Sequence, residues 1–243
     1  MKVLGIDIGG SSIKGAPVDL ETGKLIAEVE RVETPKKLRP EEMAEAVAEV
    51  SRRFKWRGAI GCGFPGVVHS GVTSFMGNLD QSFLGVNVDE LFRATTKRKV
   101  HVINDADAAG LAEVHYGAGQ KRAGSLLMLT FGTGVGSGLF QDGHLVPNTE
   151  LGHLPMKGRS AEKWVAASVK DKKKLSYAEW GGRLNTYLEL VEMVLNPDLM
   201  IVGGGISADH KKWMKHVKVK TEVLPATLHN GAGIVGAALA FAR

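Results

Sequence analysis

A glycine-rich stretch at residues 129–153 carries groups suited to two kinds of ligand. It turns on Gly132, Thr133 and Gly134 and closes with Glu150 and His153. Glycines let backbone N–H groups approach a ligand closely, and N–H groups that point into one hollow bind anions, to which the Thr133 hydroxyl adds a donor. A carboxylate and an imidazole suit hydroxyl groups instead. The stretch therefore predicts an anion site at one end and a polyol site at the other, although a glycine-rich hairpin that binds nothing would show the same pattern.

A second turn of this kind lies near the start of the chain. A short apolar run ends at Asp7, and the donors that follow it are Gly9, Gly10, Ser11, Ser12 and Lys14. The amides, hydroxyls and ammonium group suit phosphate oxygens, and the Asp7 carboxylate suits Mg²⁺, directly or through water. The chain contains no G-x-x-x-x-G-K-[ST] sequence, so this is not a P-loop. A tight hairpin with a capping serine is the alternative interpretation.

Asn104 and Asp105 lie where a predicted strand gives way to a helix. An acid at such a place is usually the helix N-cap. The ends of strands in open sheets also bind ligands, and Asp107 could cap the helix in place of Asp105. Asp105 could then accept the proton of a sugar hydroxyl that attacks phosphorus, which typically contributes a factor of about 10²–10⁴ to the rate.

Glu162 could join Glu150 and His153 in binding a polyol. A lone histidine in a loop is more often merely solvated, and His153 has no cysteine partners that would make it a metal ligand. The run Gly203-Gly204-Gly205 could approach an adenine or could simply end a strand. The pattern favours neither interpretation.

One motif is misleading. Residues 61–66 match the G-x-G-x-x-G pattern of dinucleotide-binding proteins. That pattern requires a helix to begin inside it, whereas Pro65 followed by Val67 and Val68 predicts extended or turning chain. We therefore reject a dinucleotide site at this position.

Apolar patterns predict the elements that must position these groups. A stripe of Met43, Val47, Val50 and Phe54 indicates a helix that begins at Pro40. Further helices are expected at residues 91–96, 106–116, 184–195, 211–218 and 233–241. Strands are expected at residues 2–8, 13–18, 24–32, 57–63, 99–103, 126–131, 199–202 and 221–224.

An internal repeat organises these elements. Residues 3–10 resemble residues 127–134, and both continue through a small-residue strand to an acidic turn and a Gly-x-Leu strand. Two copies of a βββαβα unit predict an α/β protein with two similar lobes that face each other across a cleft, each contributing one glycine turn. The expected small lobe is residues 1–106, with residues 229–243 packing back on it, and the expected large lobe is residues 107–228.

The composition narrows the class of protein. The chain of 243 residues is 44% hydrophobic and 23% charged, as globular proteins are, and its net charge of +5 hints only weakly at an anionic partner. Cys62 is the single cysteine, so the chain can form no internal disulfide and no cysteine-based zinc site. No signal peptide is recognisable, and the longest apolar stretch, residues 234–242, is too short to span a bilayer. We expect a soluble cytoplasmic protein that does not bind membranes.

Several motifs together resemble the ROK family of sugar kinases, in the actin and hexokinase superfamily. The matches are residues 5–15, 64–68, 77–82, 104–110, 132–136 and 146–153, in the family's order. The resemblance implies an actin/hexokinase-like (RNase H-like) fold and phosphoryl transfer to the 6-hydroxyl of glucose with Mg²⁺. It implies that Asp105 is the general base and that glucose is bound by Asn78, Asn104, Asp105, Glu150, His153 and Glu162.

Departures from the common family pattern refine the comparison. Most ROK kinases carry a cysteine-rich zinc motif after the segment that ends at His153, whereas residues 154–161 contain no cysteine. The polyphosphate-using branch resembles this chain in that respect, so we expect no structural zinc. Residues 75–78 differ in detail from that branch. The family's repressors carry an N-terminal DNA-binding helix-turn-helix, whereas the first strand expected here begins at residue 2, so a nucleic-acid partner is disfavoured. The resemblance also implies a homodimer.

The phosphoryl donor is not fixed by these motifs. One group of lysines comprises Lys170, Lys172, Lys173 and Lys174, and another comprises Lys211, Lys212, Lys215, Lys218 and Lys220. Such groups are usually solvated faces, but a long polyphosphate needs positive charge well beyond the transfer site. We expect polyphosphate to be the preferred donor and ATP its main competitor. One alternative is an ATP-dependent hexokinase for glucose or mannose. The other is a catalytically silent sugar-binding regulator, but such a protein would not need a base, so the presence of Asp105 favours an enzyme.

Overall fold

The computed structural model describes residues 1–34, 39–75 and 79–242, which form two compact units. The first unit comprises Met1–Ala112 and Gly231–Arg243, and the second comprises Glu113–Asn230. No helix in the described part of the chain is long and apolar enough to cross a membrane.

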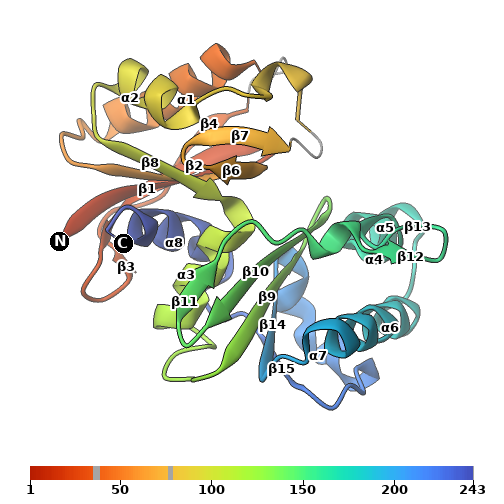
Figure 1. Cartoon of the computed structure of the whole chain (residues 1–243). Helices are drawn as coiled ribbons and strands as arrows, with labels where there is room; N and C mark the ends of the chain where they lie inside the picture. Colours follow the sequence, from red (N-terminus) through yellow and green to blue (C-terminus); the bar gives the residue numbers. More distant parts are fainter. Residues whose placement is uncertain (35–38, 76–78, 243) are drawn as a thin grey trace. The chain divides into compact units, whose positions relative to one another are not determined.

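The first unit is built on a mixed sheet in the order β3-β2-β1-β5-β8, with β4 also paired to β2 (Figure 1). Its strands are β1 (Lys2–Ile8), β2 (Ser12–Asp19), β3 (Lys24–Leu25), β4 (Glu30–Glu33), β5 (Ile60–Phe64) and β8 (Val100–Asn104). Its helices are α1 (Pro40–Arg53), α2 (Val88–Thr96), the start of α3 (Asp105–Tyr116) and α8 (Ala232–Ala240). The hairpin of β1 and β2 is antiparallel, whereas β5 and β8 continue the sheet in parallel.

The alternation of side chains along β1 determines what packs on each face of this sheet. Leu4 and Ile6 are buried in one apolar cluster with Val47 of α1, as a period-2 strand and an amphipathic helix predict. Gly5, between them, faces α8 on the other side, and a Cβ atom there would overlap the carbonyl oxygen of Ile234. A side chain at residue 5 would therefore push α8 away from the sheet.

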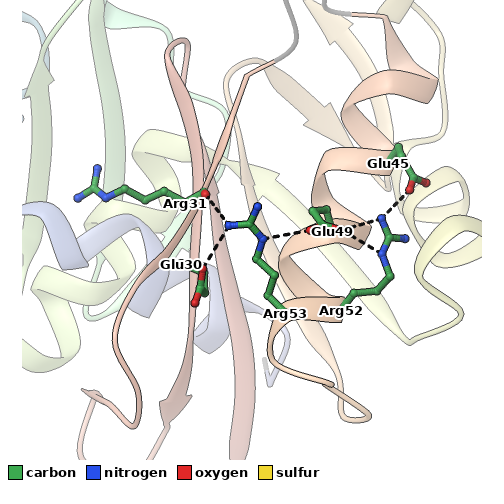
Figure 2. Close-up of polar contacts among 6 residues, drawn as sticks. All are labelled: Glu30, Arg31, Glu45, Glu49, Arg52 and Arg53. Atoms are coloured by element: carbon green, nitrogen blue, oxygen red, sulfur yellow. Dashed lines mark hydrogen bonds and ion pairs between the residues drawn. The ribbon is translucent and has the colours of Figure 1, made fainter.

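Helix α1 is joined to the sheet edge by charged side chains. The helix begins at Pro40, where no backbone N–H is needed. Near its exposed end, Arg52 and Arg53 both pair with Glu49, and Arg53 also pairs with Glu30 of β4 at 3.3 Å (Figure 2). Exposed ion pairs contribute only about 0.2–1 kcal/mol each, so this network orients β4 more than it stabilises the unit.

The second unit has a sheet in the order β11-β10-β9-β14-β15. Its strands are β9 (Ser125–Phe131), β10 (Val135–Gln141), β11 (His144–Val146), β14 (Leu199–Gly203) and β15 (Glu222–Pro225). The long helix α6 (Tyr177–Leu195) and the short helix α7 (His210–Trp213) share an apolar cluster with this sheet, and Figure 1 shows α6 to one side of the strands. Trp180 and Trp213 of these helices pack edge to face, with ring centroids 5.9 Å apart, in the apolar cluster that includes Phe131.

The remaining elements are short. In the first unit, β6 (Val67–His69) and β7 (Val72–Phe75) form a separate hairpin. In the second unit, β12 (Pro155–Met156) pairs with β13 (Arg159–Ser160), followed by α4 (Glu162–Val165) and α5 (Ala167–Lys172). No helix begins within residues 61–66, because β5 runs to Phe64 and β6 starts at Val67. The extended or turning chain expected after Pro65 is confirmed.

The internal repeat expected from the sequence is confirmed by the strand orders. In the first sheet, β1 pairs with β2 in an antiparallel hairpin and with β5 in parallel. In the second sheet, β9 pairs in the same two ways with β10 and β14. The outer strands β3 and β8 correspond likewise to β11 and β15. The repeat seen in the sequence is therefore also present in the arrangement of the strands.

Three expected elements are wrong in extent. The helix expected at residues 184–195 begins earlier, at Tyr177. The strand expected at residues 24–32 is interrupted between Leu25 and Glu30, because the ladder stops at Pro17: its carbonyl accepts from the Ile26 N–H (2.8 Å), but proline has no N–H to donate in return. The helix expected at residues 211–218 ends at Trp213 and becomes a 3-10 turn. Val217 is then extended and packs against the apolar cluster, which a continued helix would not allow.

The division between the units falls inside α3, after Ala112, and not at residue 106. Ala108, in the first turn of the helix, lies against Gly63 and Gly236, which belong to the first unit. Glu113 instead accepts hydrogen bonds from backbone N–H groups of residues 227 and 228 in the second unit. The helix thus carries the chain from one unit to the other.

Candidate active site

The first glycine turn follows β1, and its geometry is fixed by a threonine outside it. The Gly9 N–H donates to the Ser12 carbonyl oxygen (3.2 Å), which closes the turn. The Thr34 hydroxyl donates to the Gly9 carbonyl oxygen (2.7 Å), and the Thr34 N–H donates to that of Ser11 (3.4 Å). Gly10 is exposed, and a Cβ atom there would meet nothing within 4 Å. The tip of this turn is therefore open to a ligand.

Asp7 lies just before this turn, in an environment that disfavours its charged form. It is paired across the hairpin with Lys14 of β2. Its side chain lies beside the first turn of α8, where a Cβ atom at Gly233 would be 2.8 Å from the Asp7 Cγ atom. Burial raises the pKa of the Asp7 carboxyl, and the Lys14 ammonium opposes this shift. A carboxylate that burial destabilises gains more than an exposed one from a nearby cation.

Asn104, and not an aspartate, caps helix α3. Its side-chain oxygen accepts hydrogen bonds from the N–H groups of Ala106 (2.8 Å) and Asp107 (3.1 Å), and its amide nitrogen donates to the Gly66 carbonyl oxygen (3.2 Å). Asp105 is the first residue of the helix and is half-buried. The usual structural reason for an aspartate at a helix start is therefore met by its neighbour.

The second glycine turn lies between β9 and β10 and is supported in a similar way. The Gly132 N–H donates to the Gly134 carbonyl oxygen (3.0 Å). Ser168 of α5 donates its N–H to the Gly132 carbonyl oxygen (3.0 Å) and its hydroxyl to that of Thr133 (2.7 Å). The side chain of Thr133 remains exposed. In both units, a hydroxyl from outside the turn fixes one carbonyl of the turn.

Glu150 and His153 are held in place by Ser137 of β10. The Ser137 hydroxyl donates to the Thr149 carbonyl oxygen (2.7 Å) and accepts from the Leu151 N–H (3.0 Å). The Glu150 Oε2 atom lies 3.6 Å from Nε2 of His153. This segment therefore presents a carboxylate and an imidazole side by side.

The electrostatic environment of Glu150 also includes Glu162. Burial raises the pKa of the Glu150 carboxyl, His153 opposes the shift, and the negative charge of Glu162 adds to it. Glu162 is the first residue of α4 and lies against the second glycine turn, since a Cβ atom at Gly134 would be 2.5 Å from its Oε2 atom. The second unit therefore brings together the three predicted polyol residues and places them beside one predicted phosphate turn.

Three supporting residues were missed by the sequence analysis: Thr34, Ser137 and Ser168. Serine and threonine are common in loops, and the partners of Thr34 and Ser168 lie 25 and 35 residues away, so no local spacing marks them. Asn78, a predicted sugar ligand, falls outside the described residues. Within the described residues, no group of three or more histidine, cysteine, aspartate or glutamate side chains is arranged to hold a metal ion.

Comparison with known proteins gives consistent matches. Residues 3–172 match the model of the ROK family. The chain is 46% identical to the polyphosphate glucokinase of Mycobacterium tuberculosis strain CDC 1551 over 97% of this chain and 89% of that protein. The corresponding enzyme of Mycobacterium leprae is also 46% identical, over 97% of this chain and 73% of that protein.

Solved structures agree with these matches. An inorganic polyphosphate/ATP-glucomannokinase from Arthrobacter sp. strain KM superposes with a TM-score of 0.96 at 45% identity, covering 99% of this chain and 98% of that one. A ROK family glucokinase from Streptomyces griseus has a TM-score of 0.82 at 22% identity and covers 99% of both chains, which shows the fold alone. The actin/hexokinase-like α/β fold expected from the sequence is confirmed, and the chain belongs to the ROK family.

Proposed function

We propose that this protein is a sugar kinase that transfers a phosphoryl group from inorganic polyphosphate to the 6-hydroxyl of glucose. The observation that carries the proposal is 46% identity to a polyphosphate glucokinase across 97% of the chain. Such identity over nearly the whole chain covers both glycine turns and the residues around Asp105, Glu150 and Glu162. The relative from Arthrobacter, whose name includes ATP and a glucomannokinase activity, makes ATP a second candidate donor and mannose a second candidate acceptor.

In the proposed reaction, Asp105 is the general base. Its carboxylate accepts the proton of the sugar 6-hydroxyl as that oxygen forms a bond to the terminal phosphorus, and the bond from this phosphorus to the bridging oxygen breaks. The electron pair of the broken bond stays on the polyphosphate, which leaves one phosphate shorter. Support for this role comes from the start of α3, where Asn104 caps the helix and Asp105 is half-buried.

The other sugar hydroxyls are assigned to the remaining predicted sugar ligands. Glu150, His153 and Glu162 combine acceptors with an imidazole that can donate or accept, which suits a ring of hydroxyl groups. The Asn104 side chain already makes three hydrogen bonds within the protein, so it has one N–H left for a sugar oxygen. Asn78 completes the proposed set.

The phosphates are assigned to the two glycine turns. In the first unit these are Gly9, Gly10, Ser11, Ser12 and Lys14, and in the second they are Gly132, Thr133 and Gly134. Open turn tips and exposed hydroxyls support this assignment, because backbone amides and hydroxyls are the donors that phosphate oxygens use. Thr34 and Ser168 bind carbonyl groups of the two turns, whereas the N–H groups of Gly9 and Gly132 donate within their own turns.

Asp7 is the residue that would hold a Mg²⁺ ion. The site fits a single protein carboxylate, because Mg²⁺ usually binds through one or two carboxylates together with water and substrate phosphates. The raised pKa of Asp7 fits as well, since a divalent cation would offset the cost of ionising a buried carboxyl. When bound, Mg²⁺ would neutralise charge on the phosphates. The proposal also includes a homodimer and a cytoplasmic location, the latter supported by the single, buried and unpaired Cys62.

The test of the proposed base is Asp105→Asn. Asparagine keeps the shape of the side chain but cannot accept the proton, so kcat should fall by a factor of about 10²–10⁴. Glucose binding, measured by calorimetry, should change little, which also shows that the variant folds. Wild-type assays with polyphosphate and with ATP provide the reference for each donor. Near-normal turnover of the variant would contradict the assignment.

A further inference from the structure

A hollow of about 410 Å³ lies beside the second glycine turn and within the second unit. Its wall includes Gly132 and Thr133 of the turn, Ser168 and Lys170 of α5, and Tyr177 at the start of α6. Because it begins at a turn assigned to phosphate, it is where the part of the donor beyond the transferred group would extend.

One aromatic ring in the wall of this hollow lies close to lysines from two distant segments. The Lys170 Nζ atom lies 4.3 Å from the centroid of the Tyr177 ring, and the Lys212 Nζ atom lies 5.1 Å from it. Both distances are within the range of cation–π attraction, about 6 Å. The sequence contains two separate lysine groups, and the fold brings one member of each to the same ring.

The Tyr177 hydroxyl also fixes the carboxylate that holds Lys212. It donates a hydrogen bond to the Asp209 Oδ2 atom (2.6 Å), while the Asp209 Oδ1 atom pairs with the Lys212 Nζ atom (2.7 Å). The Asp209 carboxylate raises the pKa of Tyr177 to about 12, so the hydroxyl stays protonated and donating near neutral pH. Both carboxylate oxygens of Asp209 are thus bound, one by Tyr177 and the other by Lys212. With Lys170, these side chains form a group of four around the ring.

Lys170 is the cation in the group that has the weakest partner. Its side chain is only 14% exposed, and the carboxylate near it, Asp171, is 3.5 Å away and 77% exposed. A lysine whose side chain is largely buried and whose carboxylate partner is solvent-exposed is well placed to bind an anion that enters the hollow. Thr133, on the same wall, adds a hydroxyl donor.

The same geometry is poorly suited to a purine base. A base that stacked on Tyr177 would compete with two ammonium groups for the ring. A ribose hydroxyl that sought Asp209 would compete with Tyr177 and Lys212 for its oxygens. Phosphate oxygens need neither the ring nor the carboxylate, because they bind the ammonium groups directly.

We propose that Tyr177 is a positioning residue that holds Lys170 and Lys212 for the inner phosphates of the donor, and that this arrangement favours an inorganic phosphate chain over a nucleotide. The inference rests on the proposed function. It adds a determinant of donor choice, carried by residues that lie outside both glycine turns.

The decisive variants are Tyr177→Leu, which removes the ring, and Lys170→Gln, which removes a charge. Each should raise KM for polyphosphate about 3- to 30-fold, the change that a lost cation–π or ammonium–phosphate contact would cause, and should change KM for ATP less than about 2-fold. Tyr177→Phe keeps the ring and should raise KM for polyphosphate less than Tyr177→Leu. Lys121→Gln, an exposed lysine of the same unit outside the hollow, is the matched charge control and should leave both values unchanged.

Binding of tripolyphosphate without glucose, measured by calorimetry, tests the inference independently of turnover. Weaker binding to Tyr177→Leu and Lys170→Gln but not to Lys121→Gln supports it, even if the wild type proves inactive with polyphosphate and the proposed function fails. Equal binding by all four proteins, or equal rises in KM for polyphosphate and ATP, would overturn it while leaving the kinase assignment in place.

Discussion

At the residue scale, Glu150 gives the candidate sugar site a distinct dependence on pH. Burial raises the pKa of its carboxyl in the folded protein, so between the unfolded pKa near 4.5 and the higher folded value the folded state binds more protons than the unfolded state. Stability due to this group is therefore greatest at low pH and is lost as the pH rises through that window. Above that window the charge of the buried Glu150 destabilises the protein free of sugar.

Glu150→Gln should accordingly raise the melting temperature of the sugar-free protein at pH 7, because an amide has no charge to desolvate. The gain should shrink when both proteins are melted near pH 4.5, where the wild-type carboxyl is protonated to a larger extent. Glu28→Gln, at an exposed residue, should shift the melting temperature little at either pH. A gain of equal size at both pH values would show that burial of charge at Glu150 is not its cause.

The same scale shows what the sequence could and could not predict about the site. Glu150, His153 and Glu162 were expected to act together, and the structure brings them together in one unit. The role of Asn104 as helix cap was not expected, because Asp105 and Asp107 were equally good capping residues by type. Only the distances from the Asn104 side chain to the N–H groups of residues 106 and 107 distinguish them.

At the scale of elements, the sequence predicted most strands and helices, and its errors have local causes. Apolar periodicity located the helix from Pro40 and the strand ending at Ile8 because their partners impose a clear period. It failed at residues 24–32, where a proline on the neighbouring strand ends the ladder. That interruption depends on which strand is the partner, which a window of sequence does not show.

One buried carboxylate joins α3 to the segment that precedes α8. Glu113 is fully buried, and its oxygens accept hydrogen bonds from the N–H groups of Ala118, Thr227 and Leu228 and from the Thr227 hydroxyl. The chain passes from one unit to the other within α3 and again after Asn230. Within the second unit, Glu113 therefore connects the end of α3, where the chain enters that unit, with residues 227–228, shortly before the chain leaves it.

Glu113→Gln should destabilise the protein by about 3 kcal/mol, since the glutamine NH₂ group would face N–H donors and leave at least one of them buried without an acceptor. The free energy of unfolding from urea denaturation measures the change. The exposed variant Glu28→Gln should alter it by no more than about 0.5 kcal/mol. An effect of Glu113→Gln as small as that of the control would mean that water replaces the lost hydrogen bonds.

At the scale of the whole molecule, the repeat was the strongest prediction from sequence alone. Matching strand orders confirm it, from the hairpin of β1 and β2 to that of β9 and β10. The limits of the units were less predictable, because α3 is one continuous helix with neighbours in both units. Periodicity marks where a helix lies, but it does not show which end packs in which unit.

The whole-molecule charge leads to a prediction about the donor. A net charge of +5 and two lysine groups favour long anionic chains over compact ones, because a chain that contacts several cations releases counterions from each. If about three lysines contact polyphosphate, raising the salt from about 50 to about 200 mM should increase its KM on the order of 10-fold. The KM for ATP should rise much less, since its charge is confined to the transfer site, and the KM for uncharged glucose should not change. Initial rates over a salt series with each donor give both slopes, and tripolyphosphate should fall between ATP and long chains. Equal slopes for polyphosphate and ATP would show that the lysine groups are solvated surface and take no part in donor binding.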